Sequence, residues 1–438
     1  MPATDRRAFL RWLGASAAGA TALVHAAPEA KRRPSVVLFY SDDQGYADLG
    51  CYGSTDIATP NLDRLAAAGA RFTDYYSAAP ICSPSRAALL TGRSPHAAGV
   101  PGNVRAGKDV VGLPGEQVTI AEMLKHAGYR TACFGKWHLG TAPQSHPLGQ
   151  GFDEFFGHLY GCISYYDHIF SWDRRLGPVH DLWRGKKEVH EDGKYMTDLI
   201  TREALRFLAQ VGDQPFFLYL PYNAPHYPME APKKWMELYR HLGTNRQPYA
   251  AMVSALDESI GKVVAAVRHI GRADDTLFLF ASDNGPSNES RTKVEDQGPM
   301  PGSAGPFRGT KFSLWEGGIR MPCIAAWAGH IEPGTVVAEP AIAMDILATI
   351  ADAAGLEPPE GVEGHSLMPL FAGKGLPQRP LVWRRGNQWA VRLGRWKLLS
   401  RRGRKPQLFD LQEDPGEQKD LAGEQPELVE RLRGLVQK

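Results

Sequence analysis

The chain has 438 residues, 43% of them hydrophobic and 22% charged, which gives it enough apolar material for a large core and excludes a disordered protein or a small disulfide scaffold. The formal net charge is only +2, and Lys and Arg are scattered along the chain. Because the basic face expected of a nucleic-acid binder is missing, we expect no nucleic-acid partner.

The N-terminus has the pattern of a twin-arginine export signal. Arg6 and Arg7 precede an apolar stretch from Trp12 to Val24 that is rich in Ala and Gly, and small residues follow near Ala26. This stretch is too short and too rich in Gly for a good membrane span. The sequence therefore predicts a signal peptide over residues 1–27, the Tat translocase as a partner, a periplasmic or secreted protein, and no stable membrane anchor.

Four predicted strands each end in a loop that carries polar or charged side chains. The strands cover residues 34–40, 130–134, 216–220 and 276–281. Helices are predicted between them, over residues 61–70, 118–126, 195–209 and 249–270, and a further helix starts after Cys82. This alternation predicts an α/β fold, with helices on both faces of a large, mostly parallel sheet. In such sheets, sites form where the strands' carboxyl ends release their loops.

From about residue 340 the pattern changes to short strands. A helix over residues 344–354 is followed by strands near 389–392, 395–399 and 407–411 and by a last helix over 426–437. The basic run 401–405 is interpreted as a solvated turn between two strands rather than a patch for polyanions. We expect a catalytic domain over residues 34–340 and a small C-terminal α+β subdomain with an antiparallel sheet over residues 341–438.

The cysteines show neither a disulfide pattern nor a zinc-binding spacing. An odd number without close pairs argues against a disulfide framework, even though an export compartment would permit one. The chain contains no CxxC pair and no HExxH helix. One cysteine is therefore available for another role. The five are Cys51, Cys82, Cys133, Cys162 and Cys323.

Acidic and amide side chains follow two of the predicted strands. Asp42 and Asp43 come after the first, and Asp283 and Asn284 come after the strand at 276–281. Taken alone, each pair is more often a turn residue or a helix cap than a ligand. Together they offer four hard oxygen donors, which suit Ca²⁺ or Mg²⁺ better than zinc.

Basic side chains gather at the same predicted strand ends. Any one of them would be interpreted as a surface lysine or a loop histidine with its hydrogen bonds satisfied. As a group beside a divalent metal, they predict a site that holds a compact anion and its developing charge. They are Arg86, Lys136, His138, His226 and Lys311.

Two of these segments resemble the signatures of a known family. The run Cys82-Ser83-Pro84-Ser85-Arg86, continued to Arg93, resembles the signature of the type I sulfatases of the alkaline phosphatase superfamily, and Gly135-Lys136-Trp137-His138-Leu139-Gly140 is similar to their second signature. The resemblance implies a mixed, alkaline phosphatase-like sheet. It also implies that a formylglycine-generating enzyme oxidises Cys82 to Cα-formylglycine, whose hydrate is the nucleophile.

The resemblance also implies roles for the remaining residues. Asp42, Asp43, Asp283 and Asn284 would bind Ca²⁺, or Mg²⁺, together with the modified Cys82. Asp283 would also take a proton from the attacking hydroxyl. Arg86 and Lys136 would position the hydrate, and His138 would take the proton of its second hydroxyl. His226 and Lys311 would bind sulfate oxygens and protonate the leaving alcohol. The amides at the start of the helix after Cys82 would add to the attraction of the anion.

The segment after Gly151-Phe152-Asp153 departs from the family pattern, which bears on specificity rather than on reaction type. Its candidates for contact with sulfate are His158, Ser164 and His168. Polar residues on predicted loops suggest a rim that binds a sugar, and Trp and Tyr between residues 160 and 183 could stack on a pyranose. The rim candidates are Asn103, Arg105, His168, Asn288 and Arg291.

The sequence as a whole resembles those of sulfatases that act on galactose or N-acetylgalactosamine 6-sulfate, and we expect aryl sulfates to serve as surrogate substrates. Two alternatives stay open. Sulfate and phosphate esters share a tetrahedral shape, so a phosphodiesterase or phosphonate monoester hydrolase of the same superfamily fits the same motifs. A binder of sulfated glycans without turnover would keep the anion site, although it would not need the nucleophile motif.

Overall fold

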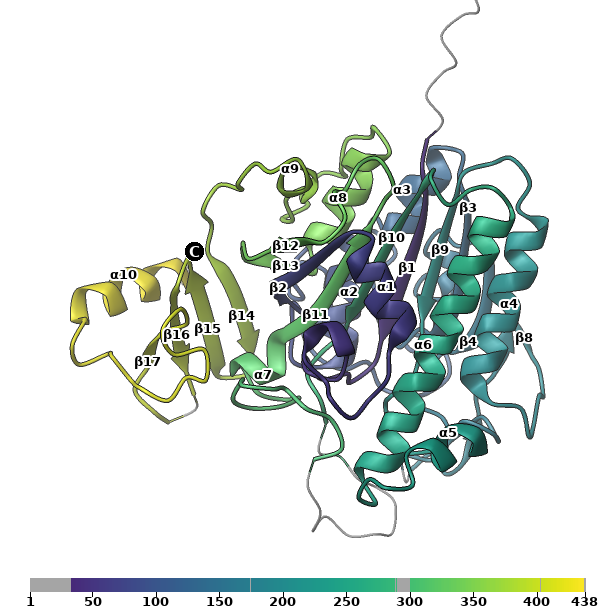
Figure 1. The fold of residues 1–438 in the computed structure, drawn as a ribbon, viewed down its shortest axis with the longest axis horizontal. Helices are drawn as coiled ribbons and strands as arrows, with labels where there is room; N and C mark the ends of the chain where they lie inside the picture. The colour runs from purple at the N-terminus through teal and green to yellow at the C-terminus, as the bar shows by residue number, and fades with distance from the viewer. Residues whose placement is uncertain (1–32, 174, 288, 290–299, 402, 437–438) are drawn as a thin grey trace, which may run out of the picture. The chain divides into compact units, whose positions relative to one another are not determined.

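A computed structural model describes residues 33–436 except 174, 288, 290–299 and 402. The predicted signal peptide lies outside the described residues. In the described part, the strands of the main sheet run in the order β12-β2-β11-β10-β1-β9-β3-β4-β7-β8, with β13 also beside β2 (Figure 1). The middle of the sheet is parallel, as predicted. Its strands are β1 (Ser35–Ser41), β3 (Arg130–Lys136), β4 (Glu154–His158), β9 (Phe216–Pro221) and β10 (Thr276–Ser282).

Antiparallel strands flank the parallel block, so the sheet is mixed, as the family resemblance implied. β11 (Arg320–Ala326) runs antiparallel to both β10 and β2 (Ala70–Tyr76). The short strands β12 (Thr335–Val337) and β13 (Ala341–Ile342) pair with β2. At the other edge, β7 (Trp183–Arg184) and β8 (Lys187–Glu188) form a hairpin beside β4. β5 (Ile169–Phe170) and β6 (Val179–His180) make a separate hairpin.

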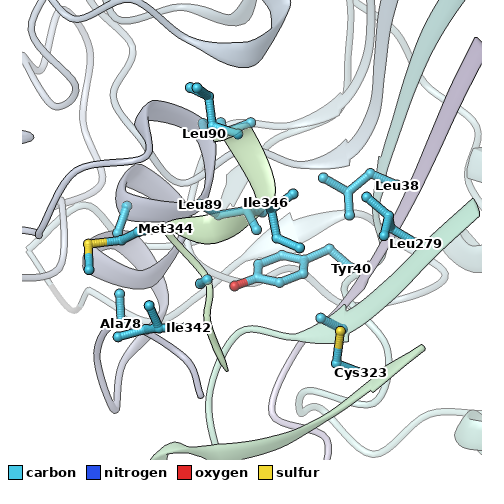
Figure 2. Packing of buried hydrophobic residues seen from close by; sticks show 14 of the residues in the cluster. Leu38, Tyr40, Ala78, Leu89, Leu90, Leu279, Cys323, Ile342, Met344 and Ile346 are labelled. Atoms are coloured by element: carbon cyan, nitrogen blue, oxygen red, sulfur yellow. The ribbon is translucent and has the colours of Figure 1, made fainter. Parts of the chain in front are cut away.

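The buried strand β1 shows how the sheet separates two cores. Side chains on a strand alternate between faces, so Leu38 and Tyr40 lie in one hydrophobic cluster and Val37 and Phe39 in the other. The first cluster includes residues of α2 (Cys82–Thr91), α3 (Ile120–His126) and α8 (Asp345–Ala353). Figure 2 shows Tyr40 packed among Leu89, Ile346 and Leu279. The second includes residues of α1 (Pro60–Ala67), α4 (Met196–Gln210) and α6 (Arg246–His269).

The predicted helices form, with ends within three residues of the predicted ones. The start of α3 has a clear local cause. The Thr119 side chain accepts a hydrogen bond from the Glu122 amide while the Glu122 side chain accepts one from the Thr119 amide, so the helix begins at Ile120 rather than Val118. Shorter helical segments complete the chain: η1 (Gly50–Tyr52), η2 (Pro147–Gly149), α5 (Lys233–Leu238), α7 (Glu316–Ile319) and α9 (Met368–Phe371).

A second, antiparallel sheet follows, as predicted, and it has one strand more than the sequence pattern indicated. Its order is β14 (Leu381–Arg385), β15 (Gln388–Leu393), β16 (Trp396–Ser400) and β17 (Gln407–Asp410), and α10 (Pro426–Val436) packs on it. The basic run lies between β16 and β17. Trp383 joins this sheet to the main one, since its indole N–H donates to the Ser77 carbonyl at 2.8 Å. Among the described residues, we find no helix with the length and apolar character to cross a membrane.

Candidate active site

Two neighbouring parallel strands bring the predicted metal ligands together. Ser41 and Ser282, the last residues of β1 and β10, lie opposite each other, so the acidic residues that follow them meet. The Asp43 backbone amide donates to Asp283 Oδ1 at 3.1 Å, and the Asn284 side-chain Nδ2 donates to Asp43 Oδ1 at 2.7 Å. All of them, with Asp42, are buried. The convergence that the sequence predicted is present, although the two pairs are 240 residues apart.

Each of the three buried carboxylates has a cation within hydrogen-bonding distance, and Arg86 Nη2 also lies 3.6 Å from Asp42 Oδ1. Lys136 Nζ lies 2.6 Å from Asp42 Oδ2, and Lys311 Nζ lies 2.8 Å from Asp43 Oδ2. The Arg86 guanidinium donates to Asp283 Oδ2 at 2.8 and 3.0 Å. Burial raises the pKa of a carboxyl, but for Asp42 the attraction of Lys136, Arg86 and Lys311 outweighs it, so the pKa of Asp42 is lowered. Paired in this way, the buried charges compensate one another.

Cys82 is the first residue of α2 and lies beside Asp42, one of these carboxylates. Its Sγ is 3.6 Å from Asp42 Oδ1, and its exposed fraction is 2%. Burial raises the pKa of the thiol far above its ordinary value, even though Lys136 and Lys311 lower it. The thiolate is the nucleophilic form of cysteine. An unmodified Cys82 is therefore protonated near neutral pH and poorly suited to attack an ester.

Arg86 and Lys136 lie behind the nucleophile rather than in the pocket. Arg86 is fully buried, and its Nη1 donates to the Lys136 carbonyl at 3.1 Å. The guanidinium also lies over the Tyr40 ring, 5.5 Å from its centroid. One side chain thus fixes the Asp283 carboxylate and the end of β3 at the same time. This location fits the positioning role that the family resemblance implied.

Both predicted site histidines are buried and neutral. His226 Nδ1 donates to the Tyr227 carbonyl at 2.7 Å, which leaves Nε2 facing Lys311 Nζ at 3.3 Å. His138 Nε2 pairs with the Val104 carbonyl at 3.1 Å, and its Nδ1 has no partner among the described residues. Burial, followed by the neighbouring cations, lowers the pKa of both rings well below the ordinary value. Each ring therefore has one unprotonated nitrogen, which is Nε2 in His226 and Nδ1 in His138.

A pocket of about 210 Å³ opens over Cys82. Of the predicted rim residues, Asn103 and Arg105 line it. Trp172, within the aromatic segment suggested from sequence, also lines it and stacks on Tyr227 with ring centroids 4.3 Å apart. The other lining residues are Cys82, Val104, Ala106, His138, Gly161, Cys162, Phe170, Asp173, His226, Tyr227, Glu289, Lys311 and Phe312.

Three candidates for contact with sulfate do not line this pocket, which corrects the sequence-based expectation. His158 is buried at the end of β4, with Nδ1 against the Tyr160 carbonyl. The Ser164 hydroxyl accepts from the Ile169 amide. His168, also expected at the rim, is fully buried and its Nε2 lies 3.1 Å from the Lys194 carbonyl. The segment curls back on itself, so its polar side chains hold the hairpin together. Asn288 and Arg291 lie outside the described residues.

Asn103 has a second contact that the sequence did not suggest. Its Oδ1 accepts from the Ser83 amide at 3.1 Å, and Pro84 has no amide hydrogen. The Ser85 amide points to the Ile81 carbonyl at 3.4 Å. Fewer amides at the start of α2 are therefore free to attract an anion than we expected from the sequence.

The donor set fits a hard divalent cation. Asp42, Asp43 and Asp283 supply carboxylate oxygens, and the Asn284 Oδ1 is buried without a hydrogen-bond partner among the described residues. An unsatisfied buried oxygen is costly unless something binds it. Oxygen donors of this kind are those preferred by Ca²⁺ and Mg²⁺. The residues present therefore fit the metal that the sequence predicted, and one atom each of Asp42, Asp43, Cys82 and His226 lie within 4.8 Å of one another.

Comparison with proteins of known function identifies the family. A family model described as Sulfatase matches residues 34–356, and one described as N-sulphoglucosamine sulphohydrolase, C-terminal, matches residues 308–437. The chain belongs to the sulfatase family. N-acetylgalactosamine-6-sulfatase of Sus scrofa is 38% identical to it over 84% of this chain and 72% of the relative. Arylsulfatase A of Homo sapiens is 34% identical over 92% of this chain and 87% of the relative.

Solved structures agree with the sequence relatives. The structure of Ps i-CgsB in complex with k-i-k-neocarrahexaose has a TM-score of 0.84 to this sulfatase and is 34% identical, covering 92% of this chain and 91% of that one. The reaction type and the fold that we expected from the motifs are therefore both confirmed. This sulfatase hydrolyses sulfate esters, and its candidate site combines a group of buried acids that suits a divalent metal with a set of buried cations.

Sequence reasoning missed two charged residues that line the pocket, Asp173 and Glu289. Glu289 lines the pocket, and its Oε2 lies 3.2 Å from Lys311 Nζ. No local motif marks Glu289, since it lies beyond Asp283-Asn284-Gly285 in an irregular segment.

Gly285 allows the segment at Gly317 to pack closely against the end of β10. A Cβ at position 285 would lie 2.0 Å from the Gly317 carbonyl oxygen. Only glycine permits this approach, which brings the loop that carries Lys311 to the acids.

Proposed function

We propose that this sulfatase removes sulfate from the 6-position of galactose or N-acetylgalactosamine units in an exported carbohydrate-degrading process, with Ca²⁺ and a Cα-formylglycine made from Cys82. The observation that carries the proposal is the position of Cys82, buried 3.6 Å from Asp42 at the bottom of a pocket that contains His138, His226 and Lys311. The relatives that act on N-acetylgalactosamine 6-sulfate and arylsulfates support the reaction and the substrate class.

The two groups that the chain must acquire supply different chemistry. Oxidation of the Cys82 thiol to an aldehyde by a formylglycine-generating enzyme gives a hydrate with two hydroxyls, one to attack sulfur and one to release sulfate afterwards. A bound Ca²⁺ supplies a Lewis acid that polarises the oxygens of the ester. Asp42, Asp43, Asp283 and Asn284 would hold the metal.

Lys311 and His226 are placed to act on the ester itself. Both line the pocket, and Lys311 Nζ lies 3.3 Å from His226 Nε2. A protonated lysine attracts the sulfate oxygens, and in the ester complex the proton shared between the two groups can pass to the leaving alcohol oxygen. The Tyr227 carbonyl fixes the His226 tautomer, so that Nε2 is the nitrogen that faces the substrate.

His138 also lines the pocket and is placed to accept a proton. Its Nδ1 has a free lone pair, because Nε2 is held by the Val104 carbonyl. The ring can therefore remove a proton from the second hydroxyl during release of sulfate. Asp283 Oδ2 accepts from Arg86, but burial, the larger effect, raises the pKa of this carboxyl above its ordinary value. A carboxylate with a raised pKa is a better acceptor for the proton of the attacking hydroxyl.

The sugar would lie between Arg105 and the stacked Trp172 and Tyr227. Aromatic faces and a cation at a pocket mouth suit a pyranose that carries hydroxyl groups. The phosphodiesterase alternative is not favoured, since the relatives with 34–38% identity are sulfatases. We also propose that the Tat translocase exports the enzyme to the periplasm or beyond, because residues 1–27 have the pattern of its signals.

The test has two parts. Mass spectrometry of the peptide over residues 72–86 should find the loss expected for conversion of thiol to aldehyde. The modified enzyme should then cleave 6-sulfated N-acetylgalactosamine or galactose faster than the 4-sulfated isomers, with little turnover of a matched phosphodiester. An unmodified thiol in active enzyme, or a higher kcat/KM for the diester, would refute the proposal.

A further inference from the structure

Three histidines and two acidic residues gather away from the site described above. One ligand atom each from His168, His180 and Asp192 lie within 4.8 Å of one another, as do atoms of His180, Glu188 and His190. The three residues of the first group come from three places: the residue before β5, the end of β6 and the loop before α4. No spacing motif connects them, which is why the sequence predicted no zinc site.

The hydrogen bonds decide which nitrogen of each ring is free. His168 Nε2 lies 3.1 Å from the Lys194 carbonyl and must donate to it, so His168 Nδ1 carries the lone pair. His180 Nδ1 lies 2.9 Å from a Glu188 carboxylate oxygen and donates to it, so His180 Nε2 carries the lone pair. Both free nitrogens are buried, and neither has a partner among the described residues.

This pattern is the one that metal-binding histidines show. Such a histidine usually donates its second ring N–H to a carboxylate or a backbone carbonyl, which fixes the tautomer and the ring orientation. Here one ring has the carbonyl partner and the other the carboxylate partner. His168 is also fully inaccessible to solvent. Its Nδ1 is therefore a buried nitrogen that no described residue satisfies.

We propose that His168 Nδ1, His180 Nε2 and the Asp192 carboxylate bind a zinc ion at a second metal site, separate from the Asp42 site. Two imidazoles and a carboxylate are a donor set that Zn²⁺ accepts, with a water as the fourth ligand. Bond lengths near 2.0–2.1 Å put tetrahedral ligand atoms about 3.3 Å apart, and one ligand atom from each of the three residues already lies within 4.8 Å of the others, so a bound ion would draw the side chains closer together. Asp192 is exposed and can make that movement.

The location suggests what the ion does. His168 directly precedes β5 and His180 pairs with Ile169 across the hairpin. Phe170 and Trp172, on the same hairpin and the turn that follows it, line the active-site pocket. Zinc at this position would tie the hairpin to the loop before α4. It would therefore fix the pocket wall that contacts the sugar, without contact to the reacting atoms.

The test is zinc binding by the mature enzyme, not activity alone. After chelation and reloading with excess Ca²⁺, equilibrium dialysis with elemental analysis should find one Zn²⁺ per chain, and substituted Co²⁺ should give the visible absorption of a tetrahedral site. His180→Ala and Asp192→Asn should each abolish binding of this zinc ion. Glu188→Gln should weaken it about 10- to 100-fold, as expected for an orienting partner. His269→Ala, at an exposed position on α6, is the matched control and should change nothing.

Several outcomes would overturn the proposal. One is no zinc uptake by the wild type, and another is uptake unchanged in both His180→Ala and Asp192→Asn. Loss of uptake in His190→Ala with full uptake in Asp192→Asn would place the ion between His180, Glu188 and His190 instead. Because Asp192 is exposed, its variant should melt like the wild type without zinc, which separates loss of the ion from misfolding. Zinc should raise the melting temperature of the wild type and of His269→Ala but not that of Asp192→Asn.

Discussion

Arg86 places two of its nitrogens on a single oxygen of Asp283, at 2.8 and 3.0 Å, and both side chains are fully buried. The other oxygen of Asp283 is left to accept the Asp43 amide. The pair therefore orients one metal-binding carboxylate while the guanidinium also reaches the Lys136 carbonyl.

Arg86→Lys should nearly abolish turnover. Lysine keeps the charge but cannot supply the planar set of donors, so the carboxylate and the end of β3 both lose a fixed partner. We expect kcat on an aryl sulfate to fall by about 100-fold or more. This corresponds to about 3 kcal/mol, the loss expected when a buried, charged hydrogen-bonded pair is broken. Arg64→Lys, at an exposed position on α1, is the control. A kcat within a few fold of the wild type would contradict the assigned role of Arg86.

Gly161→Ala should displace His138. A Cβ at position 161 would lie 2.8 Å from His138 Cε1, closer than such atoms approach, so the ring must move. We expect kcat to fall by about tenfold or more with a smaller change in KM, as for a misplaced catalytic group. Gly102→Ala is a matched control near the pocket, because a Cβ there has open space. Equal kinetics for the two variants would argue against a role for His138 in the reaction.

Removal of the metal should inactivate and destabilise the enzyme together. A chelator that removes the ion leaves the side-chain oxygen of Asn284 without a partner. The buried carboxylates are then neutralised only by their lysine and arginine partners. Activity should disappear and the melting temperature should fall, and added Ca²⁺ should restore both. Asp43→Asn should raise the Ca²⁺ concentration needed for recovery. Full activity in chelator would contradict a metal at this position.

Glu417 should make stability depend on pH. Its side chain is buried, with Oε1 2.9 Å from Lys397 Nζ and Oε2 accepting from the Glu316 amide. Burial, which outweighs the attraction of Lys397, raises the pKa of Glu417 from 4.5 to about 7. The folded state then binds a proton that the unfolded state has released, so this group's contribution is fully present below about pH 4.5 and is lost as pH rises to about 7.

Glu417→Gln cannot titrate and should remove that slope. The free energy of unfolding of the wild type should fall relative to that of the variant between pH 4.5 and 7, by at most about 1.4 kcal/mol per pH unit, and the difference should stay constant above pH 7. Denaturant unfolding at several pH values measures it. A difference that is independent of pH would show that Glu417 is ionised in the folded protein throughout.

The sequence predicted the chemistry of the site better than its surroundings. Asp42 and Asp283 follow buried apolar runs, and the carboxyl ends of parallel strands meet at one edge, so their convergence could be expected. The antiparallel direction of β11 could not, because its buried run has the same apolar pattern as a parallel strand. β14 was missed for a different reason: alternating Leu381 and Trp383 occur in a segment with many polar residues.

The pocket wall could not be derived from sequence at all. His168 and Trp172 are four residues apart, yet one is buried inside the hairpin and the other lines the pocket. Their directions depend on a left-handed residue, since His168 has φ of 56°. The hydrophobic periodicity of a sequence does not predict the backbone conformation of such a turn.

The pairing of the buried carboxylates with cations has a thermodynamic consequence. A divalent cation that enters the site competes with Lys136 and Lys311 for the oxygens of Asp42 and Asp43. The displaced ammonium group of Lys311, which lines the pocket, can then pair with an anion. Metal and sulfate should therefore bind with positive cooperativity. Because such coupling is reciprocal, product sulfate should tighten Ca²⁺ binding by the same factor by which Ca²⁺ tightens sulfate binding.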